Sequence, residues 1–365
     1  MDLKKKVVLF TPEFPPFRDS GGIGNHALNL AKQLTAQGHA VTVVTETRHL
    51  KENPYSNSGM RVVFVPRKSN IVFTIIGRLN KLLSVSKKND LVICSGKFPL
   101  WTAPILRFRF SKKKYIAILH GTELDARNPV KKWYTNYCLT LFDKLVSVSG
   151  YTAQFIPKKL LDKVTIIPNG VDLEVDKTHQ LIQDKILTVG STSQRKGQLN
   201  VVHALPSLLK SYPNAHYYMI GLEGYKEKIA SKAELLYIPD HCHLLGKLSD
   251  AEMYEQYRQT EVYMLLSEHT SDGDFEGFGI SVLEANYFGV PAIGSKNSGI
   301  EDAIEDGKTG ILVDPHQPEQ ILLAYKTIKE NYNFFSENAL NWAEKHHWCK
   351  IVNRYQEVIE SLYSR

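Results

Sequence analysis

Short runs rich in β-branched residues alternate with helical patterns of about 10–15 residues along the whole chain of 365 residues. This alternation is typical of parallel α/β domains, in which a helix follows each strand and packs on the sheet. It occurs in two successive series. The predicted strands are 6–11, 40–46, 61–65, 90–94, 114–120, 144–149 and 163–167 in the first series, and 186–189, 217–220, 243–245, 262–266, 291–294 and 310–313 in the second.

Two domains are therefore predicted, and a chain of this length has room for about two. The first spans residues 1–172 and the second residues 178–345. Turn residues lie between the two series, in the segment Pro168-Asn169-Gly170-Val171-Asp172. The last segment, 349–365, places its apolar residues on one helical face, so we expect a helix that packs against another part of the protein.

The two halves carry opposite charge. Residues 1–170 contain 27 Lys and Arg against 10 Asp and Glu, a net charge of +17, whereas residues 171–365 carry −10. A strongly basic half attracts an anionic partner, such as nucleic acid, acidic lipid or a phosphorylated substrate. The acidic half argues against a protein that wraps nucleic acid, and no nucleic-acid partner is predicted.

The location is predicted from what the sequence does not contain. The apolar runs are far shorter than the roughly 20 residues of a membrane span, and the N-terminal one is too short for a signal peptide. The four cysteines are widely scattered without a CxxC pair, so neither a disulfide framework nor a zinc site is expected. We expect a cytoplasmic protein with buried thiols.

A glycine-rich segment, Ser20-Gly21-Gly22-Ile23-Gly24-Asn25-His26-Ala27, opens a predicted helix. Glycines at a helix N-terminus let a phosphate approach backbone N–H groups. The segment also fits the GxGxxA pattern of dinucleotide-binding folds, with Glu46 about 20 residues further on. That fit is weak, because a proline-containing stretch separates the first predicted strand from the glycines. A flexible loop without ligand is the alternative.

A second glycine-rich turn lies between a strand and a buried helix and carries two glutamates, Glu276 and Glu284. They could hold the two ends of an elongated ligand whose phosphates face the N–H groups of Phe278, Gly279 and Ile280. The alternative is structural, with Glu276 as an acid favoured by the helix dipole and Glu284 on a solvated helix face.

Two cations, Arg195 and Lys196, precede Gly197 where a strand gives way to a helix. Positive charges at a helix N-terminus oppose the helix dipole, which is unfavourable unless an anion lies between them. This conflict favours phosphate binding over a plain solvated turn.

His120 ends a predicted strand within His120-Gly121-Thr122-Glu123, at the edge where open α/β sheets place ligands. A structural role for this histidine is equally compatible with the sequence. Asp272 and Asp274 have the spacing of a metal-binding pair but lie in a polar loop without a third ligand in view, so no metal site is predicted.

Together these motifs resemble the retaining nucleotide-sugar glycosyltransferases of family 4, which have the GT-B fold. The resemblance covers nearly the whole chain and extends to Gly289-Val290-Pro291-Ala292-Ile293-Gly294 and Gly299-Ile300-Glu301-Asp302-Ala303. It implies an α/β architecture of two Rossmann-like, doubly wound parallel-sheet domains that face a central cleft. The N-terminal domain would bind the acceptor and the C-terminal domain the nucleotide sugar, and helix 349–365 would cross back to complete the N-terminal domain.

The resemblance also implies roles for individual residues. His120 would orient the sugar, Arg195 and Lys196 would clamp the diphosphate, and no metal or cofactor would be needed. In the family an Arg commonly follows the glycine of the first C-domain strand, and Ser191 stands there instead. The implied catalytic residues are His120, Glu276, Arg195 and Lys196, and the implied donor-binding residues are Gly22, Leu245, Gly246, Lys247, Phe278, Gly279, Ile280 and Glu284.

The implied reaction moves a hexose-type sugar from a nucleotide-diphosphate sugar to a hydroxyl acceptor, which we expect to be a lipid-linked glycan or glycolipid of cell-surface polysaccharide synthesis. A UDP-sugar 2-epimerase of the same two-domain architecture is the alternative. An NAD-dependent oxidoreductase is a third possibility, based only on the GxGxxA match.

Basic residues of the N-terminal half are interleaved with apolar ones, which predicts peripheral attachment to the anionic inner face of the plasma membrane. The alternative is that the apolar residues are core and the cations only solvate the surface. The basic residues are Arg67, Lys68, Arg78, Lys81, Lys87, Lys88, Arg107, Arg109, Lys112, Lys113, Lys114, Lys131 and Lys132, and the apolar ones are Ile71, Val72, Phe73, Ile75, Ile76, Leu79, Leu82, Leu83, Trp101, Phe108 and Trp133.

Overall fold

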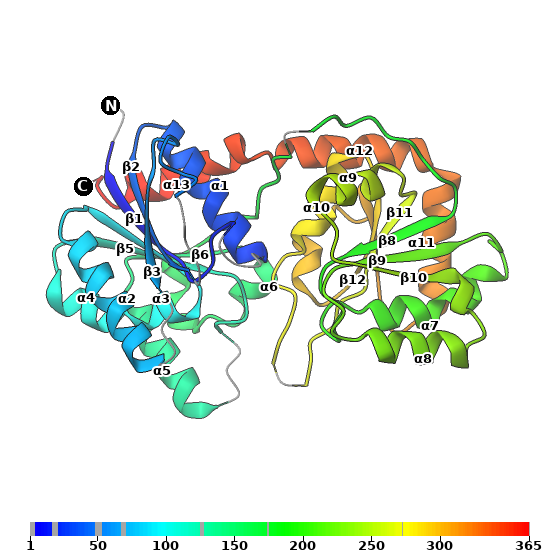
Figure 1. Ribbon diagram of the computed structural model, residues 1–365, viewed down its shortest axis with the longest axis horizontal. Helices are drawn as coiled ribbons and strands as arrows, with labels where there is room; N and C mark the ends of the chain where they lie inside the picture. The colour runs from blue at the N-terminus through cyan, green and yellow to red at the C-terminus, as the bar shows by residue number, and fades with distance from the viewer. Residues whose placement is uncertain are drawn as a thin grey trace. The chain divides into compact units, whose positions relative to one another are not determined.

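The chain forms two compact units, each with its own parallel sheet (Figure 1). The computed structural model describes residues 4–16, 21–47, 53–66, 71–124, 128–173, 175–271 and 273–364. Unit 1 comprises Met1–Asn169 together with Trp348–Arg365, and unit 2 comprises Gly170–His347. The last helix, α13 (Trp348–Ser361), therefore belongs to unit 1, together with the N-terminal part of the chain.

Unit 1 contains a seven-stranded sheet in the order β3-β2-β1-β4-β5-β6-β7, with parallel pairing throughout. Apart from polar residues at their ends, such as Lys6 and Ser95, its central strands are apolar, because helices cover both faces of a parallel sheet. Val7, Val8 and Leu9 of β1, for example, have no exposed surface. The strands are β1 (Lys6–Phe10), β2 (Ala40–Thr47), β3 (Arg61–Pro66), β4 (Leu91–Ser95), β5 (Lys114–Leu119), β6 (Lys144–Ser147) and β7 (Val164–Ile166).

The helices of unit 1 divide between the two faces of this sheet. Leu82, Leu100, Leu106 and Cys138 share one apolar core and place α2, α3, α4 and α5 on the same face. Helix α1 contacts α13 and β2. The helices are α1 (Gly22–Ala36), α2 (Ile71–Ser86), α3 (Lys97–Trp101), α4 (Ala103–Arg109), α5 (Pro129–Thr140), α6 (Gly150–Ala153) and the 3₁₀ helix η1 (Lys158–Lys163).

Unit 2 contains a six-stranded parallel sheet in the order β10-β9-β8-β11-β12-β13. The strands are β8 (Lys185–Val189), β9 (His216–Ile220), β10 (Cys242–Gly246), β11 (Val262–Leu265), β12 (Ala292–Ser295) and β13 (Gly310–Val313). The helices are α7 (Gln198–Leu209), α8 (Lys226–Leu235), α9 (Asp250–Arg258), α10 (Ile280–Tyr287), α11 (Pro318–Glu330), α12 (Tyr332–Lys345), η2 (Pro239–His241) and η3 (Gly299–Asp302).

The predicted fold class, two doubly wound α/β domains, is confirmed, and every predicted strand is present with ends within two residues. The predicted strand 144–149 is shorter, because Ser149 caps the short helix α6 by accepting a hydrogen bond from the N–H of Thr152 at 2.9 Å. In unit 2 the strand order reverses between β8 and β11, and open α/β sheets bind ligands beyond the carboxyl ends of such strands.

Candidate functional site

Arg195 and Lys196 lie on the loop that joins β8 to α7, at the carboxyl edge of the unit 2 sheet. The loop is a tight turn, in which the N–H of Gly197 donates to the carbonyl of Gln194 at 3.0 Å. Gly197 caps α7 with a φ of 68°, and a Cβ at this position would lie 1.7 Å from the carbonyl oxygen of Leu266, which follows β11. Only glycine lets the two loops approach so closely, so the turn brings both cations beside the segment that follows β11.

Glu276, on that neighbouring segment, pairs with both cations. Its Oε2 atom lies 2.9 Å from Nζ of Lys196 and accepts a hydrogen bond from the Arg195 guanidinium. Its Oε1 atom accepts from the N–H of Gly279, the N-cap of α10, at 3.2 Å. Burial favours the protonated carboxyl, but the charges of Lys196 and Arg195 outweigh it and lower the pKa of Glu276 to about 2. Glu276 is therefore ionised at neutral pH.

Asp274 supplies a second carboxylate to the same cluster. Its Oδ2 atom lies 3.1 Å from Nε of Arg195, so the guanidinium is shared between Asp274 and Glu276. This arrangement corrects the argument that two cations at a helix N-terminus need a bound anion, because two carboxylates from a remote segment already neutralise them. The other aspartate of the predicted pair, Asp272, lies outside the described residues.

Glu284 lies in the second turn of α10 and is not on a solvated helix face. It accepts a hydrogen bond from the hydroxyl of Tyr257, on α9, at 2.9 Å. Burial raises the pKa of Glu284. The carboxylate is thus held in place by a side chain of another helix, as a group that orients a ligand must be.

The segment 245–247 reaches the same carboxyl edge from the outermost strand. Gly246 ends β10 with a φ of 67° and accepts a hydrogen bond from the N–H of Gly221, which follows β9, at 2.9 Å. Leu245 is partly buried and Lys247 is exposed. The segments that follow three strands, β8, β10 and β11, therefore carry most of the predicted catalytic and donor-binding residues.

His120 belongs to unit 1, where it follows β5. Its Nε2 atom lies 2.9 Å from the hydroxyl of Ser95, at the end of the neighbouring strand β4. The carboxylate of Glu123 accepts hydrogen bonds from the backbone N–H groups of His120 and Gly121, at 3.1 and 2.9 Å. Burial lowers the pKa of His120 to about 4, so the imidazole is neutral at pH 7.

His26 is a residue near this site that the sequence argument did not single out. It lies on α1 and is almost fully buried, and its ring centroid is 5.0 Å from that of His120. Its Nε2 atom lies 2.8 Å from the hydroxyl of Tyr355 on α13, and Trp348 packs against it. The sequence did contain a pattern that indicates burial of His26, because this histidine stands at helical spacing among the apolar residues of α1 that are buried.

Gly22 is the first residue of α1 and is exposed. The first turn of this helix contains no acidic residue, and its N-cap, Gly21, has no side chain that could cap the backbone N–H groups. The predicted site residues thus form two groups. Gly22 and His120 lie in unit 1, and the cations, the glutamates, 245–247 and 278–280 lie in unit 2.

The structure does not support the dinucleotide alternative at Glu46. This residue is buried in β2 and pairs with the guanidinium of Arg78 on α2, so its carboxylate is already engaged inside unit 1. In a dinucleotide-binding fold the corresponding acid faces the ribose of the cofactor. The helix α1 also starts well after the end of β1, as the proline-containing stretch predicted.

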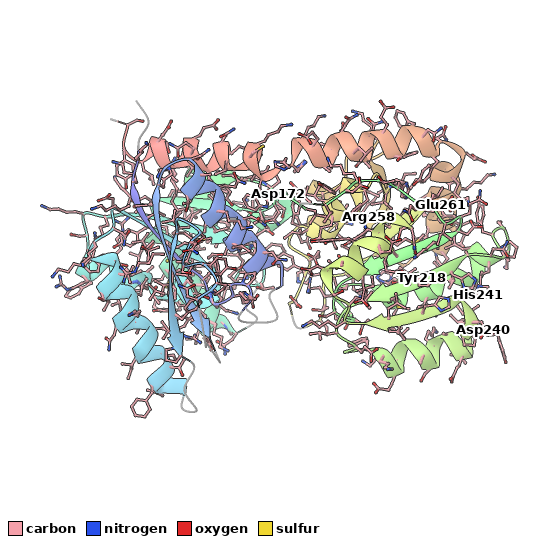
Figure 2. All side chains as sticks on the ribbon, turned by 45° about the horizontal axis from the view of Figure 1, so that its top comes forward. Asp172, Tyr218, Asp240, His241, Arg258 and Glu261 are labelled. Carbon is pink, nitrogen blue, oxygen red and sulfur yellow. The ribbon has the colours of Figure 1, made fainter. Side chains whose placement is uncertain are left out.

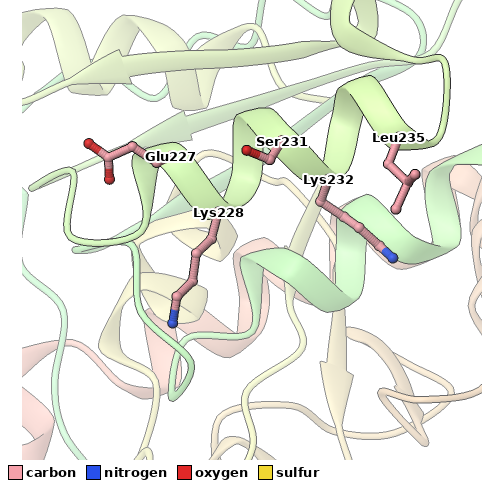
Figure 3. A pocket seen from close by; sticks show the side chains of 5 residues that line it. All are labelled: Glu227, Lys228, Ser231, Lys232 and Leu235. Atoms are coloured by element: carbon pink, nitrogen blue, oxygen red, sulfur yellow. The ribbon is translucent and has the colours of Figure 1, made fainter.

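Neither clustered metal-ligand side chains nor a surface hollow adds a second candidate site within the described residues. Within the described residues, no group of three or more His, Cys, Asp or Glu side chains is arranged to hold a metal ion. A surface hollow lies over α8, and Figure 3 shows that its lining side chains all come from this one helix. The hollow contains none of the predicted site residues, and we assign it no role. Its lining residues are Glu227, Lys228, Ser231, Lys232 and Leu235.

Comparison with known proteins agrees with the fold and the motifs. The model of the family described as "Glycosyltransferase Family 4" matches residues 20–175, and that of "Glycosyl transferases group 1" matches residues 174–346. Between them the two models span most of both units. The chain belongs to glycosyltransferase family 4, and it is a glycosyltransferase of the GT-B fold.

Similar proteins cover most of the chain. A GDP-mannose-dependent α-(1-6)-phosphatidylinositol monomannoside mannosyltransferase of Mycolicibacterium smegmatis is 24% identical over 87% of each chain. A sucrose-phosphate synthase of Thermosynechococcus elongatus has the same fold, with a TM-score of 0.78 and 16% identity over 99% of each chain. The Anabaena protein HepE, solved in complex with UDP and glucose, gives a TM-score of 0.72 and 16% identity over 98% of this chain and 100% of its own.

Proposed function

We propose that this glycosyltransferase moves a hexose-type sugar from a nucleotide-diphosphate sugar to a hydroxyl acceptor with retention of anomeric configuration. The observation that carries the proposal is the cluster of Arg195, Lys196 and Glu276 at the point where the strand order of the unit 2 sheet reverses. Two fixed cations beside a helix N-terminus suit a diphosphate leaving group. Two similar proteins support this substrate class, since one is a GDP-mannose-dependent mannosyltransferase and the other was solved in complex with UDP and glucose.

Each group has a role in this proposal. Lys196 and Arg195 stabilise the charge that develops on the departing diphosphate, and the N–H groups at the start of α10 face its oxygens. Glu276 accepts hydrogen bonds from the donor sugar, and Glu284 from the ribose. Residues 245–247 flank the base, while the N–H of Gly22 contacts the donor phosphate.

The proposed chemistry is a same-face displacement. The bond from the anomeric carbon to the phosphate oxygen breaks, and the acceptor oxygen forms its bond on the same face. The departing phosphate oxygen accepts the proton of the acceptor hydroxyl. The neutral imidazole of His120 orients the sugar near the anomeric carbon, and the cations take the place of a metal ion, so neither metal nor cofactor is required.

A donor screen tests this proposal. Purified protein is incubated with UDP-, GDP- and ADP-sugars, an acceptor lipid extract and excess EDTA, and release of nucleoside diphosphate is followed. We expect release with one donor, dependent on acceptor, and a product whose anomeric proton coupling matches the donor. Donor isomerisation without acceptor would instead favour the 2-epimerase, and reduction of NAD would favour an oxidoreductase.

Glu284 provides a prediction on donor binding. Glu284→Ala should raise the KM for the donor about tenfold and leave kcat nearly unchanged, because hydrogen bonds to the ribose are made equally in the ground and transition states. Tyr257→Phe, which frees the carboxylate and removes a weaker 3.4 Å hydrogen bond to the carbonyl of Ser281, should give a smaller change in the same direction. Steady-state kinetics against donor concentration measure both, and wild-type values for Glu284→Ala would remove Glu284 from the site.

We also propose that unit 1 binds an anionic membrane surface and that the acceptor is lipid-linked, with the enzyme on the cytoplasmic face of the plasma membrane. Phe108 on α4 is 92% exposed and Trp133 on α5 is 67% exposed, and both helices lie on the same face of the sheet as α2. Exposed cations accompany these side chains, and each contributes about 1 kcal/mol near an anionic leaflet. The exposed cations of these helices and their flanks are Lys81, Lys87, Lys88, Arg109, Lys112, Lys131 and Lys132.

The structure removes several residues from the predicted membrane-binding patch of basic and apolar residues in unit 1. Arg78 pairs with Glu46 in the interior, Arg107 pairs with Asp143 at 2.6 Å, and Leu82 is core. Arg67 and Lys68 lie outside the described residues. Within the part of the chain that is described, no helix is long and apolar enough to cross a bilayer.

Vesicle cosedimentation tests the membrane proposal. The protein should sediment with vesicles that contain anionic lipid, not with purely zwitterionic ones, and high salt should release it. Phe108→Ala combined with Trp133→Ala should weaken binding at least tenfold, whereas Leu323→Ala, at an exposed leucine of unit 2, should have no effect. Protein that stays in the supernatant with anionic vesicles at low salt would contradict the proposal.

A further inference from the structure

Four charged side chains of unit 2 form one connected cluster. Arg195 contacts both Asp274 and Glu276, and Lys196 contacts Glu276. The two carboxylates differ in their surroundings. The side chain of Glu276 is 11% exposed and held by two cations and the N–H of Gly279, whereas the side chain of Asp274 is 43% exposed and contacts Arg195 alone among the described cations.

The backbone fixes Asp274 beside Arg195. The hydroxyl and the N–H of Thr270 both donate to the carbonyl of Asp274 at 2.8 Å, and the N–H of Asp274 donates back to that hydroxyl at 3.0 Å. The preceding residue, Gly273, has a φ of 89° and its N–H donates to the carbonyl of Thr270 at 3.1 Å. A hydrogen-bonded turn therefore presents the carboxylate to the guanidinium, and the ion pair is not a chance contact of two flexible side chains.

The cluster is neutral, which is a poor environment for a dianionic or trianionic diphosphate. If either carboxylate separates from its cation, that cation becomes available to the diphosphate. Release of Glu276 would break two ion pairs in a nearly buried place, at a large cost in free energy. Release of Asp274 breaks one pair, and its carboxylate returns to water at little cost.

We propose that Asp274 is a built-in counter-ion of Arg195 that the donor's diphosphate displaces. The proposal rests on the proposed function of the cluster as the diphosphate site. Asp274 then lowers the affinity for nucleotide and so sets the concentration range in which donor binds and diphosphate product leaves. A purely structural role, in which Asp274 only holds Arg195 in place for the phosphate, predicts the opposite sign, because its loss would loosen Arg195 and weaken binding.

Calorimetric titration with UDP, GDP and ADP separates these two roles. Asp274→Asn should bind the nucleoside diphosphate that wild type binds with about fivefold lower Kd, since a partly exposed ion pair contributes up to about 1 kcal/mol. The affinity of Asp274→Asn should also fall more steeply with added salt, because the site has gained one net positive charge.

Asp240→Asn is the matched control. This variant removes one negative charge from the same unit. Asp240 directly precedes β10 and so lies at the amino edge of the sheet, away from the strand ends that carry the cluster (Figure 2). Its Kd should equal that of wild type. Lys196→Ala should bind at least tenfold more weakly.

The outcomes are distinguishable. Unchanged or weaker binding by Asp274→Asn, together with weaker binding by Lys196→Ala, overturns the counter-ion role and leaves the diphosphate site standing. If no nucleoside diphosphate binds to wild type, or if Lys196→Ala binds like wild type, the site assignment fails and the counter-ion role fails with it. A thermal melt of each variant shows that the folded protein is being titrated.

Discussion

Lys196→Ala should lower kcat/KM for glycosyl transfer by at least about 100-fold. The ammonium group of Lys196 lies 2.9 Å from Glu276, and the side chain is only 13% exposed. Lys196 directly precedes Gly197, the N-cap of α7, which is where we place the leaving diphosphate. Removing one preorganised charge of this kind lowers the rate roughly 10²–10³-fold, because water cannot stabilise the developing negative charge as well as a fixed cation does. Steady-state release of nucleoside diphosphate at several donor concentrations measures the loss.

Lys226→Ala is the control for this variant. Lys226 is exposed and pairs with its neighbour Glu223 at 2.8 Å, on the surface of α8 and away from the predicted site residues, so its removal should leave kcat/KM unchanged. Arg195→Ala should be nearly as harmful as Lys196→Ala, because Ser191 offers no cation in its place. Wild-type turnover in both Arg195→Ala and Lys196→Ala would contradict the assignment of the diphosphate to these side chains.

Gly197→Ala should destabilise unit 2 by more than about 3 kcal/mol or prevent it from folding. The residue has a φ of 68°, and a Cβ would lie 1.7 Å from the oxygen and 2.4 Å from the carbon of the Leu266 carbonyl. Both are backbone atoms next to the end of β11, so relief of the clash requires the sheet and the loop to separate. Denaturant unfolding followed by circular dichroism measures the free energy of unfolding.

Gly307→Ala is the matched control for this clash. Gly307 has a similar φ of 73°, but a Cβ there would meet no atom within 4 Å. Its replacement should cost only about 1 kcal/mol, the strain of a left-handed backbone. Equal losses in the two variants would show that backbone conformation, and not the approach of the two loops, makes Gly197 necessary.

The fold followed from the sequence because its determinants are local. Runs of apolar residues such as Val7–Phe10 can be buried only in a sheet covered on both faces, and the helical stretches between them dictate parallel pairing. The strand ends then placed Arg195 and Glu276 at one edge of one sheet. Their membership in a single site was therefore predictable from the motifs and their order.

The contacts within the site were not predictable in the same way. Glu276 follows Arg195 by 81 residues, and nothing in the local sequence indicates that its carboxylate bonds both cations. Two cations of the predicted basic patch, Arg78 and Arg107, were assigned to the surface for the same reason, because Glu46 and Asp143, which engage them, are remote in sequence. Such pairings depend on tertiary structure and not on spacing.

Hydrogen–deuterium exchange with and without saturating UDP, GDP or ADP tests the central claim, that unit 2 holds the donor's diphosphate at the carboxyl edge of its sheet. One of these nucleotides should slow exchange of the backbone amides in residues 193–200 and 276–283, while helix α8 (Lys226–Leu235), with its surface hollow, should be unaffected. The absence of protection in both segments with all three nucleotides would contradict the account.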